Sequence, residues 1–406
     1  MIFKIAFKNV WRNKARSLIV IIAITLGLAG GIFTASIITG MVEQKIRTGI
    51  NNEVSHLQVH QPDFLKNFES RYVIPHADSI ACVISKIPEV KAVCSRTRIT
   101  GMVASPNSAA GIQIVGVDPA REKKVTTLYT AIPDSGGGYF TGSRKNQIVI
   151  GRKLADKLKI RLKSKVVIRF QNTDGNLTEA AFSVNGIYQT ANTVFDETNV
   201  FIKKSDLDLL TGCDNGIQEI AFILKDIAKI PSVEASLKDE LPGLFVQNWM
   251  EIRPDMGMVT SAIAIEVYII LGIILFALAF GIVNTMLMIV FERTRELGML
   301  MAVGMSKSRV FRMIMLETIF LTVIGGVLGM ALSATLVAYF HKHGIDLSSA
   351  SKGLGAFGFD PKIYPYISRE FYINLTGMIF CTGILSAVMP ARKALKLKPV
   401  EAIRVE

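Results

Sequence analysis

Four long apolar stretches alternate with sequence of ordinary mixed polarity. They cover Ser17–Val42, Val267–Phe291, Thr318–Phe340 and Phe371–Pro390, and each is free of charged residues. About 20 apolar residues in a helix are enough to cross the roughly 30 Å hydrocarbon core of a bilayer. The pattern therefore predicts a membrane protein with four transmembrane α-helices, at residues 17–42, 263–291, 310–340 and 370–390.

A cleaved signal peptide is the alternative interpretation of the first stretch, because basic residues precede it. The apolar part of a signal peptide is shorter, however, at about 7–15 residues before a small-residue cleavage site. Only the weak sequence Thr34-Ala35-Ser36 suggests such a site. We therefore expect a retained membrane anchor. The preceding residues 1–16 have Phe3 and Phe7 at helical spacing beside lysines, which predicts an amphipathic helix on the membrane lipid at the cytoplasmic interface.

Residues 43–262, between the first and second spans, have the pattern of an α/β domain. Short β-branched runs alternate with helical patterns, and turn sequences separate them. The strand-like runs are 111–117, 147–150, 166–170, 180–187, 199–202 and 219–224, and the helical patterns are 77–87, 152–159, 204–210 and 232–241. We expect two subregions, one from residues near 70–105 and 216–250 and a β-rich one inserted between them.

The net charge of +13 is unevenly distributed. Residues 43–255 contribute only +3, and the remaining +10 flanks the apolar stretches. This distribution follows the positive-inside rule and argues against a nucleic-acid groove. It places both termini, the connector at 292–306 and the tail at 391–406 in the cytoplasm. The 43–262 domain and the loop at 341–369 then lie outside a bacterial cytoplasmic (inner) membrane, as a periplasmic domain and a periplasmic loop.

The sequence has little that indicates catalysis or metal binding. Gly304-Met305-Ser306-Lys307-Ser308 lacks the first glycine of a phosphate-binding loop, so we expect neither an enzyme activity nor a cofactor on this chain. The cysteines lack metal-ligand spacing with histidines. Outside the membrane, Cys82 and Cys94 leave two alternatives open, a disulfide or small buried thiols, and Cys213 makes the count odd.

The connector between the second and third spans has a chemically distinctive pattern. Leu297, Leu300, Met301 and Gly304 fall on one helical stripe, and a charged end precedes them, made of Glu292, Arg293, Arg295 and Glu296. A short helix that lies against a partner and a solvated turn between two spans both fit this pattern.

A family resemblance favours the first of these interpretations. The motif Glu292-Arg293-x-x-Glu296-Leu297-Gly298-x-x-x-Ala302-x-Gly304 resembles the coupling-helix signature of FtsX/MacB-type permeases of ABC transporters. Residues 6–17, 390–394 and 399–404 agree with it, and 55–60 resembles a segment of lipoprotein-releasing (LolC/LolE-like) permease subunits. Met301 departs from the pattern, since many relatives have a basic residue there.

The resemblance implies a mechanism and a set of partners. Two permease subunits, identical or different, would pair, and a separate ATPase subunit that holds ATP and Mg would dock on each coupling helix and drive mechanotransmission to the periplasmic side. The resemblance implies lipoprotein release, with a lipoprotein substrate and a periplasmic chaperone or adaptor. MacB-like export of peptides or drugs and FtsX-like activation of cell-wall hydrolases are the alternatives.

Two further features lie inside the predicted spans. Glu317, near Arg312, resembles a glutamate that is common in the family. We expect a structural role, by snorkelling or by pairing with a basic neighbour, in preference to substrate or ion binding. Gly27 with Gly31, and Gly325 with Gly329, have the spacing that lets helix backbones approach closely. For these four glycines we favour contact between chains over packing within one chain.

Overall fold

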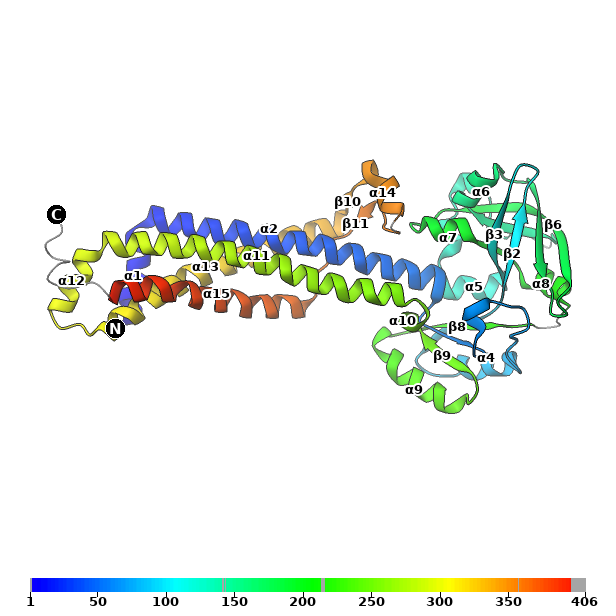
Figure 1. Ribbon diagram of the computed structural model, residues 1–406, viewed down its shortest axis with the longest axis horizontal. Helices are drawn as coiled ribbons and strands as arrows, with labels where there is room; N and C mark the ends of the chain where they lie inside the picture. Colours follow the sequence, from blue (N-terminus) through cyan, green and yellow to red (C-terminus); the bar gives the residue numbers. More distant parts are fainter. Residues whose placement is uncertain (1, 141, 143, 213–215, 357, 396–406) are drawn as a thin grey trace. The chain divides into compact units, whose positions relative to one another are not determined.

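A computed structural model describes residues 2–140, 142, 144–212, 216–356 and 358–395. The chain divides into two compact units (Figure 1). The helical unit consists of residues 1–42, 261–346 and 362–406, and the α/β unit consists of residues 43–260 and 347–361.

The helical unit is built on long helices. Its elements are α1 (Ile2–Arg12), α2 (Lys14–Gly49), α11 (Pro254–Glu292), α12 (Thr294–Ala302), α13 (Lys307–His343), the short strands β10 (Ile345–Asp346) and β11 (Lys362–Ile363), and α15 (Arg369–Leu395). In the described part of the chain, four helices are long and apolar enough to cross a membrane, namely α2, α11, α13 and α15. α2 and α11 continue well past the apolar stretches, because polar residues at 43–49 and 254–262 remain helical.

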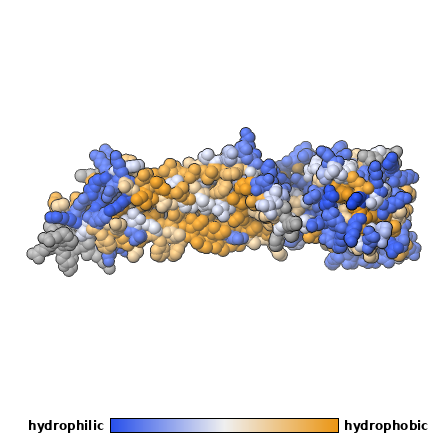
Figure 2. All heavy atoms as spheres, turned by 90° about the horizontal axis from the view of Figure 1, so that it is seen from above, coloured by the Kyte–Doolittle hydropathy of each residue, from blue (hydrophilic) through white to orange (hydrophobic). Residues whose placement is uncertain are grey.

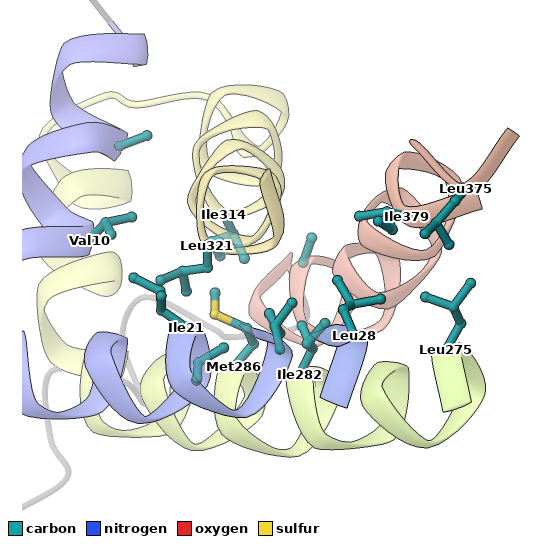
Figure 3. Packing of buried hydrophobic residues seen from close by; sticks show 14 of the residues in the cluster. Val10, Ile21, Leu28, Leu275, Ile282, Met286, Ile314, Leu321, Leu375 and Ile379 are labelled. Carbon is teal, nitrogen blue, oxygen red and sulfur yellow. The ribbon is translucent and has the colours of Figure 1, made fainter. Parts of the chain in front are cut away.

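The interior of the helical unit is apolar, and so is much of its outside. Leu28, Leu275, Leu321 and Leu375 come from four different helices and pack in one buried cluster (Figure 3). Large apolar side chains also point outward, and Phe276 is 67% exposed. Figure 2 shows them as an orange surface over the long helices. An apolar exterior of this extent suits contact with lipid, where each helix pairs its own backbone N–H and C=O groups in hydrogen bonds.

The four paired glycines bring helices of the same chain together. A Cβ at Gly27 or Gly31 would lie within 3 Å of Leu278 or Ile274 of α11. A Cβ at Gly325 would lie 2.8 Å from Ile24 of α2, and one at Gly329 would lie 3.0 Å from Leu28. These glycines therefore pack α2 against α11 and α13. Each glycine has a large side chain of the same chain opposite it, and the contact between chains that we favoured from the sequence stays a prediction.

The α/β unit has one nine-stranded sheet in the order β3-β7-β4-β6-β5-β2-β8-β1-β9, and β2 also pairs with β3. The strands are β1 (Leu57–His60), β2 (Val90–Ala104), β3 (Ala109–Val117), β4 (Gln147–Gly151), β5 (Lys165–Gln171), β6 (Leu177–Tyr188), β7 (Asn199–Lys203), β8 (Glu219–Leu224) and β9 (Phe245–Asn248). The β2–β3 pairing closes six strands into a ring, and β8, β1 and β9 extend from the first half of β2.

Helices cover both parts of this sheet. They are the π-helix η1 (Ile50–Val54), α3 (Phe64–Asn67), α4 (Ala77–Ser85), α5 (Pro119–Val125), α6 (Arg152–Leu158), α7 (Thr193–Thr198), α8 (Lys204–Thr211), α9 (Ile230–Glu240), α10 (Trp249–Ile252) and α14 (Ser351–Ala356), with 3-10 turns η2 (Leu128–Ala131), η3 (Asp134–Gly136), η4 (Ile227–Lys229) and η5 (Ser348–Ala350). The ring has its own core from residues 99–207. The extension has a second core, from residues 50–90 and 217–256.

The cysteines of the α/β unit are thiols where the structure describes them. Cys94 is buried in β2 and Cys82 is exposed on α4, and both are free. The structure thus has no disulfide between these two residues, and of the two only Cys94 is the buried thiol of the other alternative. Cys213 lies outside the described residues.

Candidate functional site

The predicted connector is a short helix, α12, whose charged start is paired inside the helical unit. Arg12 of α1 donates to both carboxylate oxygens of Glu296, at 2.7 and 2.6 Å. Arg16 at the start of α2 forms an ion pair with Glu292 at the end of α11. Two arginines four residues apart thus face two glutamates four residues apart. The sequence analysis missed these contacts, because Arg12 and Glu296 are 284 positions apart and nothing local links them.

A buried ion pair lies beneath these exposed ones. The guanidinium of Arg293 is 3.2 Å from the carboxylate of Glu317 on α13 and 3.1 Å from that of Glu296. Asn9 of α1 donates to Glu317 at 2.6 Å. Glu317 is only 4% exposed, so these contacts compensate a charge that water cannot reach. The expected structural pairing is present, but the basic partner is Arg293 rather than Arg312.

Apolar contacts anchor one face of α12 to the bundle. Leu297 and Gly298 are buried, and Met301 packs against the core cluster. The other face is open: Arg295, Met299 and Ala302 are exposed on it, Met299 at 51%, and so is Val303, the residue directly after α12, at 89%. These exposed side chains are available to a partner, and Arg295 belongs to the charged end as well.

Gly304 ends α12 in a conformation that suits glycine. Its φ is +104°, and a Cβ there would meet nothing within 4 Å. The N–H of Met305 bonds back to the carbonyl of Leu300 at 2.9 Å, which closes the end of the helix. The role that the structure gives Gly304 is thus to terminate the helix.

The electrostatics keep the connector charged. The hydrogen bond from Arg12, followed by that from Arg293, holds the pKa of Glu296 below its usual value. The carboxylate therefore stays ionised through the neutral range and its pairing with α1 persists. In the described residues no group of three or more histidines, cysteines and acids is placed to hold a metal ion.

Together these contacts join the connector to the neighbouring helices of the helical unit. α1 packs on α13, with Phe3 and Phe320 in edge-to-face contact at 4.8 Å between ring centroids. The ion pairs described above join α1 to α12 through Arg12 and Glu296, α2 to the end of α11 through Arg16 and Glu292, and the start of α12 to α13 through Arg293 and Glu317. Within the predicted 1–16 segment the structure has a helix at Ile2–Arg12, and this helix packs on the bundle. Its position at the cytoplasmic interface stays a prediction.

Comparison with known proteins identifies the two units. Residues 17–240 match the model of the MacB-like periplasmic core domain, and residues 268–399 match that of the FtsX-like permease C-terminal region. A solved structure, the periplasmic region of MacB from Actinobacillus actinomycetemcomitans, has a TM-score of 0.37 and 14% identity, and the match covers 53% of this chain and 98% of that one.

Relatives extend the match over the whole chain. An uncharacterised ABC transporter permease of Methanocaldococcus jannaschii is 25% identical, over 100% of this chain and 98% of that protein. The lipoprotein-releasing system transmembrane protein LolC of Neisseria meningitidis is 22% identical, over 96% and 94%. The macrolide export ATP-binding/permease protein MacB of Bordetella avium is 33% identical, over 40% of this chain and only 22% of that protein. With four apolar helices and an inserted α/β unit, this chain is a multi-pass membrane protein that belongs to the FtsX/MacB family of ABC transporter permeases.

Proposed function

We propose that this permease couples ATP hydrolysis on a separate ATPase subunit, which holds the ATP and Mg, to the release of lipoproteins from the cytoplasmic membrane. Two permease subunits would pair, with both termini and α12 in the cytoplasm and the α/β unit outside. The observation that carries the coupling role is the design of α12, which is fixed to α1 and α13 on one face and presents Met299, with Val303 directly after the helix, on the other. Exposed apolar side chains on a charged protein end suit a partner surface.

The share of each relative that matches this chain supports a lipoprotein as the substrate. The match to LolC covers nearly all of both chains, whereas the match to MacB covers less than a quarter of that protein. Export with a periplasmic adaptor is the second candidate, supported by the MacB-like core domain over residues 17–240. Activation of cell-wall hydrolases is the third, although the 43–260 segment is larger than the small outer domains of such regulators.

The test begins with the complex. The tagged full chain is purified from its native membranes in mild detergent, and the co-purifying proteins are identified. We expect an ATPase, and we expect the permease separated from it neither to bind nor to hydrolyse ATP. Val303→Asp, on the open face of α12, should abolish co-purification, and Ile227→Asp, an equally apolar and 56% exposed position in the α/β unit, is the matched control.

The second step discriminates the functions. The complex is reconstituted in liposomes with a triacylated lipoprotein, and ATP-dependent transfer of that lipoprotein to a soluble periplasmic carrier is measured. ATP-dependent efflux of macrolides is measured in parallel. Transfer without efflux supports lipoprotein release, and efflux without transfer would replace it with export. If no ATPase co-purifies, and Val303→Asp behaves like Ile227→Asp, the coupling role itself is wrong.

A further inference from the structure

A cavity of about 640 Å³ lies within the α/β unit, and the transport function makes no use of it. Its walls come from the last turns of α2 with η1, from strands β2 and β3, from α7, and from the residues that lead into α11. The volume is within the roughly 300–1,000 Å³ of small-molecule sites. Both cores of the unit contribute to it, through Met256 of one and Ile112 of the other.

One side of the cavity is a polar floor on the sheet. Thr100 of β2 pairs with Gln113 of β3, and Gln113 pairs with Asn199 of β7, so these side chains share a face. Arg98, two residues before Thr100, lies on the same face and donates to the Gln113 side-chain oxygen at 2.8 Å. The side-chain oxygen of Asn199, a residue only 5% exposed, has no hydrogen-bond partner in the described structure. An unpaired buried oxygen beside a cavity is costly unless an occupant donates to it.

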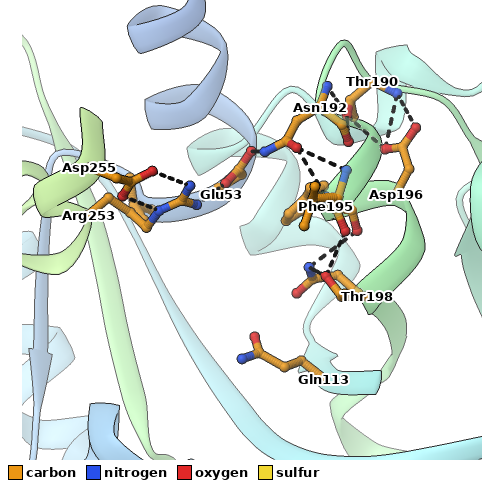
Figure 4. Close-up of polar contacts among 12 residues, drawn as sticks. Glu53, Gln113, Thr190, Asn192, Phe195, Asp196, Thr198, Arg253 and Asp255 are labelled. Atoms are coloured by element: carbon orange, nitrogen blue, oxygen red, sulfur yellow. Dashed lines mark hydrogen bonds and ion pairs between the residues drawn. The ribbon is translucent and has the colours of Figure 1, made fainter. Parts of the chain in front are cut away.

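The opposite wall has two carboxylates, Glu53 and Asp255, that share one guanidinium, that of Arg253. Glu53 lies between Arg253 and Asn192 (Figure 4). One carboxylate oxygen accepts from Arg253 at 2.6 Å and the other from Asn192 at 2.7 Å, and Arg253 also donates twice to Asp255 at 2.9 Å. Both carboxylates bond to Arg253, so its guanidinium is not available to an anionic ligand, and the three groups sum to one net negative charge when both acids are ionised. Burial raises the pKa of Glu53 above its usual value, which reduces that charge.

Lys45 is the exception on this wall. Its amine lies 4.8 Å from the centre of the Phe359 ring, and the described residues place no carboxylate within 4 Å of it. The remaining walls are apolar, with Leu65, Phe195 and Met256 among them. The cavity thus combines one available cation with apolar surface and a polar floor.

We propose that this cavity binds an amphipathic anion, whose carboxylate, sulfate or phosphate head pairs with Lys45 and whose apolar body lies against Leu65, Phe195 and Met256. A protonated head or a hydroxyl on the ligand can donate to Asn199. The site is distinct from α12 and does not depend on which cargo the transporter moves. The source of the anion is either a free amphiphile or an anionic lipid of the membrane, and the two share this chemistry.

Two positions allow the cavity to be filled without disturbing the core. Gly111 lies two residues before Gln113 on the same face of β3, and a Cβ there would meet nothing within 4 Å. Val194 of α7 lines the cavity and is 61% exposed. Tryptophan at either position should occupy the space that a ligand needs, whereas Gly111→Ala should not.

The test uses the full chain in phosphatidylcholine nanodiscs, with 11-(dansylamino)undecanoic acid as the fluorescent probe and its uncharged methyl ester for comparison. Folding of each variant is checked by size exclusion and thermal unfolding. We expect saturable one-to-one binding that Gly111→Trp and Val194→Trp abolish and Gly111→Ala retains. Lys45→Met should weaken binding of the acid about tenfold, as expected for the loss of one charge-assisted contact, and should leave binding of the ester unchanged. Lys229→Met, an exposed lysine that does not line the cavity, is the charge control.

The outcomes separate the alternatives. Weaker probe binding in phosphatidylglycerol nanodiscs supports the proposal with a membrane lipid as the competing ligand, and equal binding supports it with a free amphiphile. The absence of saturable binding in phosphatidylcholine overturns it. Binding that survives both tryptophan variants, or that is equal for acid and ester, overturns it as well. If one tryptophan variant does not fold, the other decides.

Discussion

Arg293 and Glu317 form an ion pair, 3.2 Å apart, between the start of the connector and the first turns of α13, with side chains that are 16% and 5% exposed. Removing one member of a buried pair leaves an uncompensated charge, which costs about 3–5 kcal/mol. Arg293→Met should therefore lower the thermal stability of the purified chain strongly. Replacing both charges by apolar groups of similar size is often nearly neutral, so adding Glu317→Met should recover much of the loss. Equal or additive losses in the single and double variants would show that the two side chains do not depend on each other.

The exposed pair Arg12–Glu296 should behave differently. Its members are 52% and 42% exposed, and such pairs contribute only about 0–1 kcal/mol to stability. Glu296→Lys should therefore insert and fold normally, but it places a third cation beside Arg12 and Arg293 and should release α1 from α12. We expect weaker ATPase co-purification, restored when Arg12→Glu is added. If the double variant stays defective while Arg12→Glu alone is normal, Glu296 contacts the partner directly and does not act through α1.

A pH effect is expected at Asp196 in the α/β unit. Its carboxylate accepts hydrogen bonds from the Thr190 backbone N–H at 2.9 Å and hydroxyl at 2.7 Å (Figure 4), yet burial raises its pKa from 3.8 to about 7. The folded state therefore holds a proton that the unfolded chain loses near pH 4. The resulting stability is fully present below pH 3.8 and is lost as pH rises to about 7.

Asp196→Asn removes this titration and can still accept from Thr190. We expect the difference in melting temperature between the variant and the original chain to grow in favour of the variant from pH 5 to pH 8, and to level off above that. Other groups titrate in both proteins and cancel in the difference. A difference that is constant with pH, measured by thermal unfolding in one detergent, would contradict the raised pKa.

The orientation of the chain can be measured with single reporter cysteines. A cysteine at Lys307, at the start of α13, should be shielded from an impermeant thiol reagent in intact cells, and one at Asp174, in the turn between β5 and β6, should react. Cys213 must be replaced beforehand, and so must Cys82, because it is exposed. Reaction at position 307 with protection at 174 would invert the proposed topology.

The long apolar stretches could be recognised from sequence because a charge-free segment of that length has few structural solutions. The ends of α2 and α11 could not be recognised in this way, because polar residues such as Glu43 and Asp255 do not indicate whether a helix ends or continues. Contacts across the chain were also out of reach: Arg12 and Glu296 are 284 positions apart, and nothing local links them. The spacing of Gly27 and Gly31 suits a neighbouring helix from either chain, so the sequence could not show that Leu278 and Ile274 of the same chain lie against these glycines.

The pairing of β1 with β9 has a mechanical consequence. The two strands are antiparallel, and Leu57 lies opposite Asn248. α2 and η1 lead into the chain just before Leu57, and α10 and α11 follow directly after Asn248. Both long helices are thus attached at the same end of one strand pair. Pulling the helices apart would load the hydrogen bonds one after another, as in a zipper, whereas moving the helices together along their length would leave the pair unloaded. The strand pair is therefore loaded when α2 and α11 separate at this end, and it stays unloaded when the two helices move together along their length. Separation of these two helices is thus the movement to which the β1–β9 pairing is most sensitive.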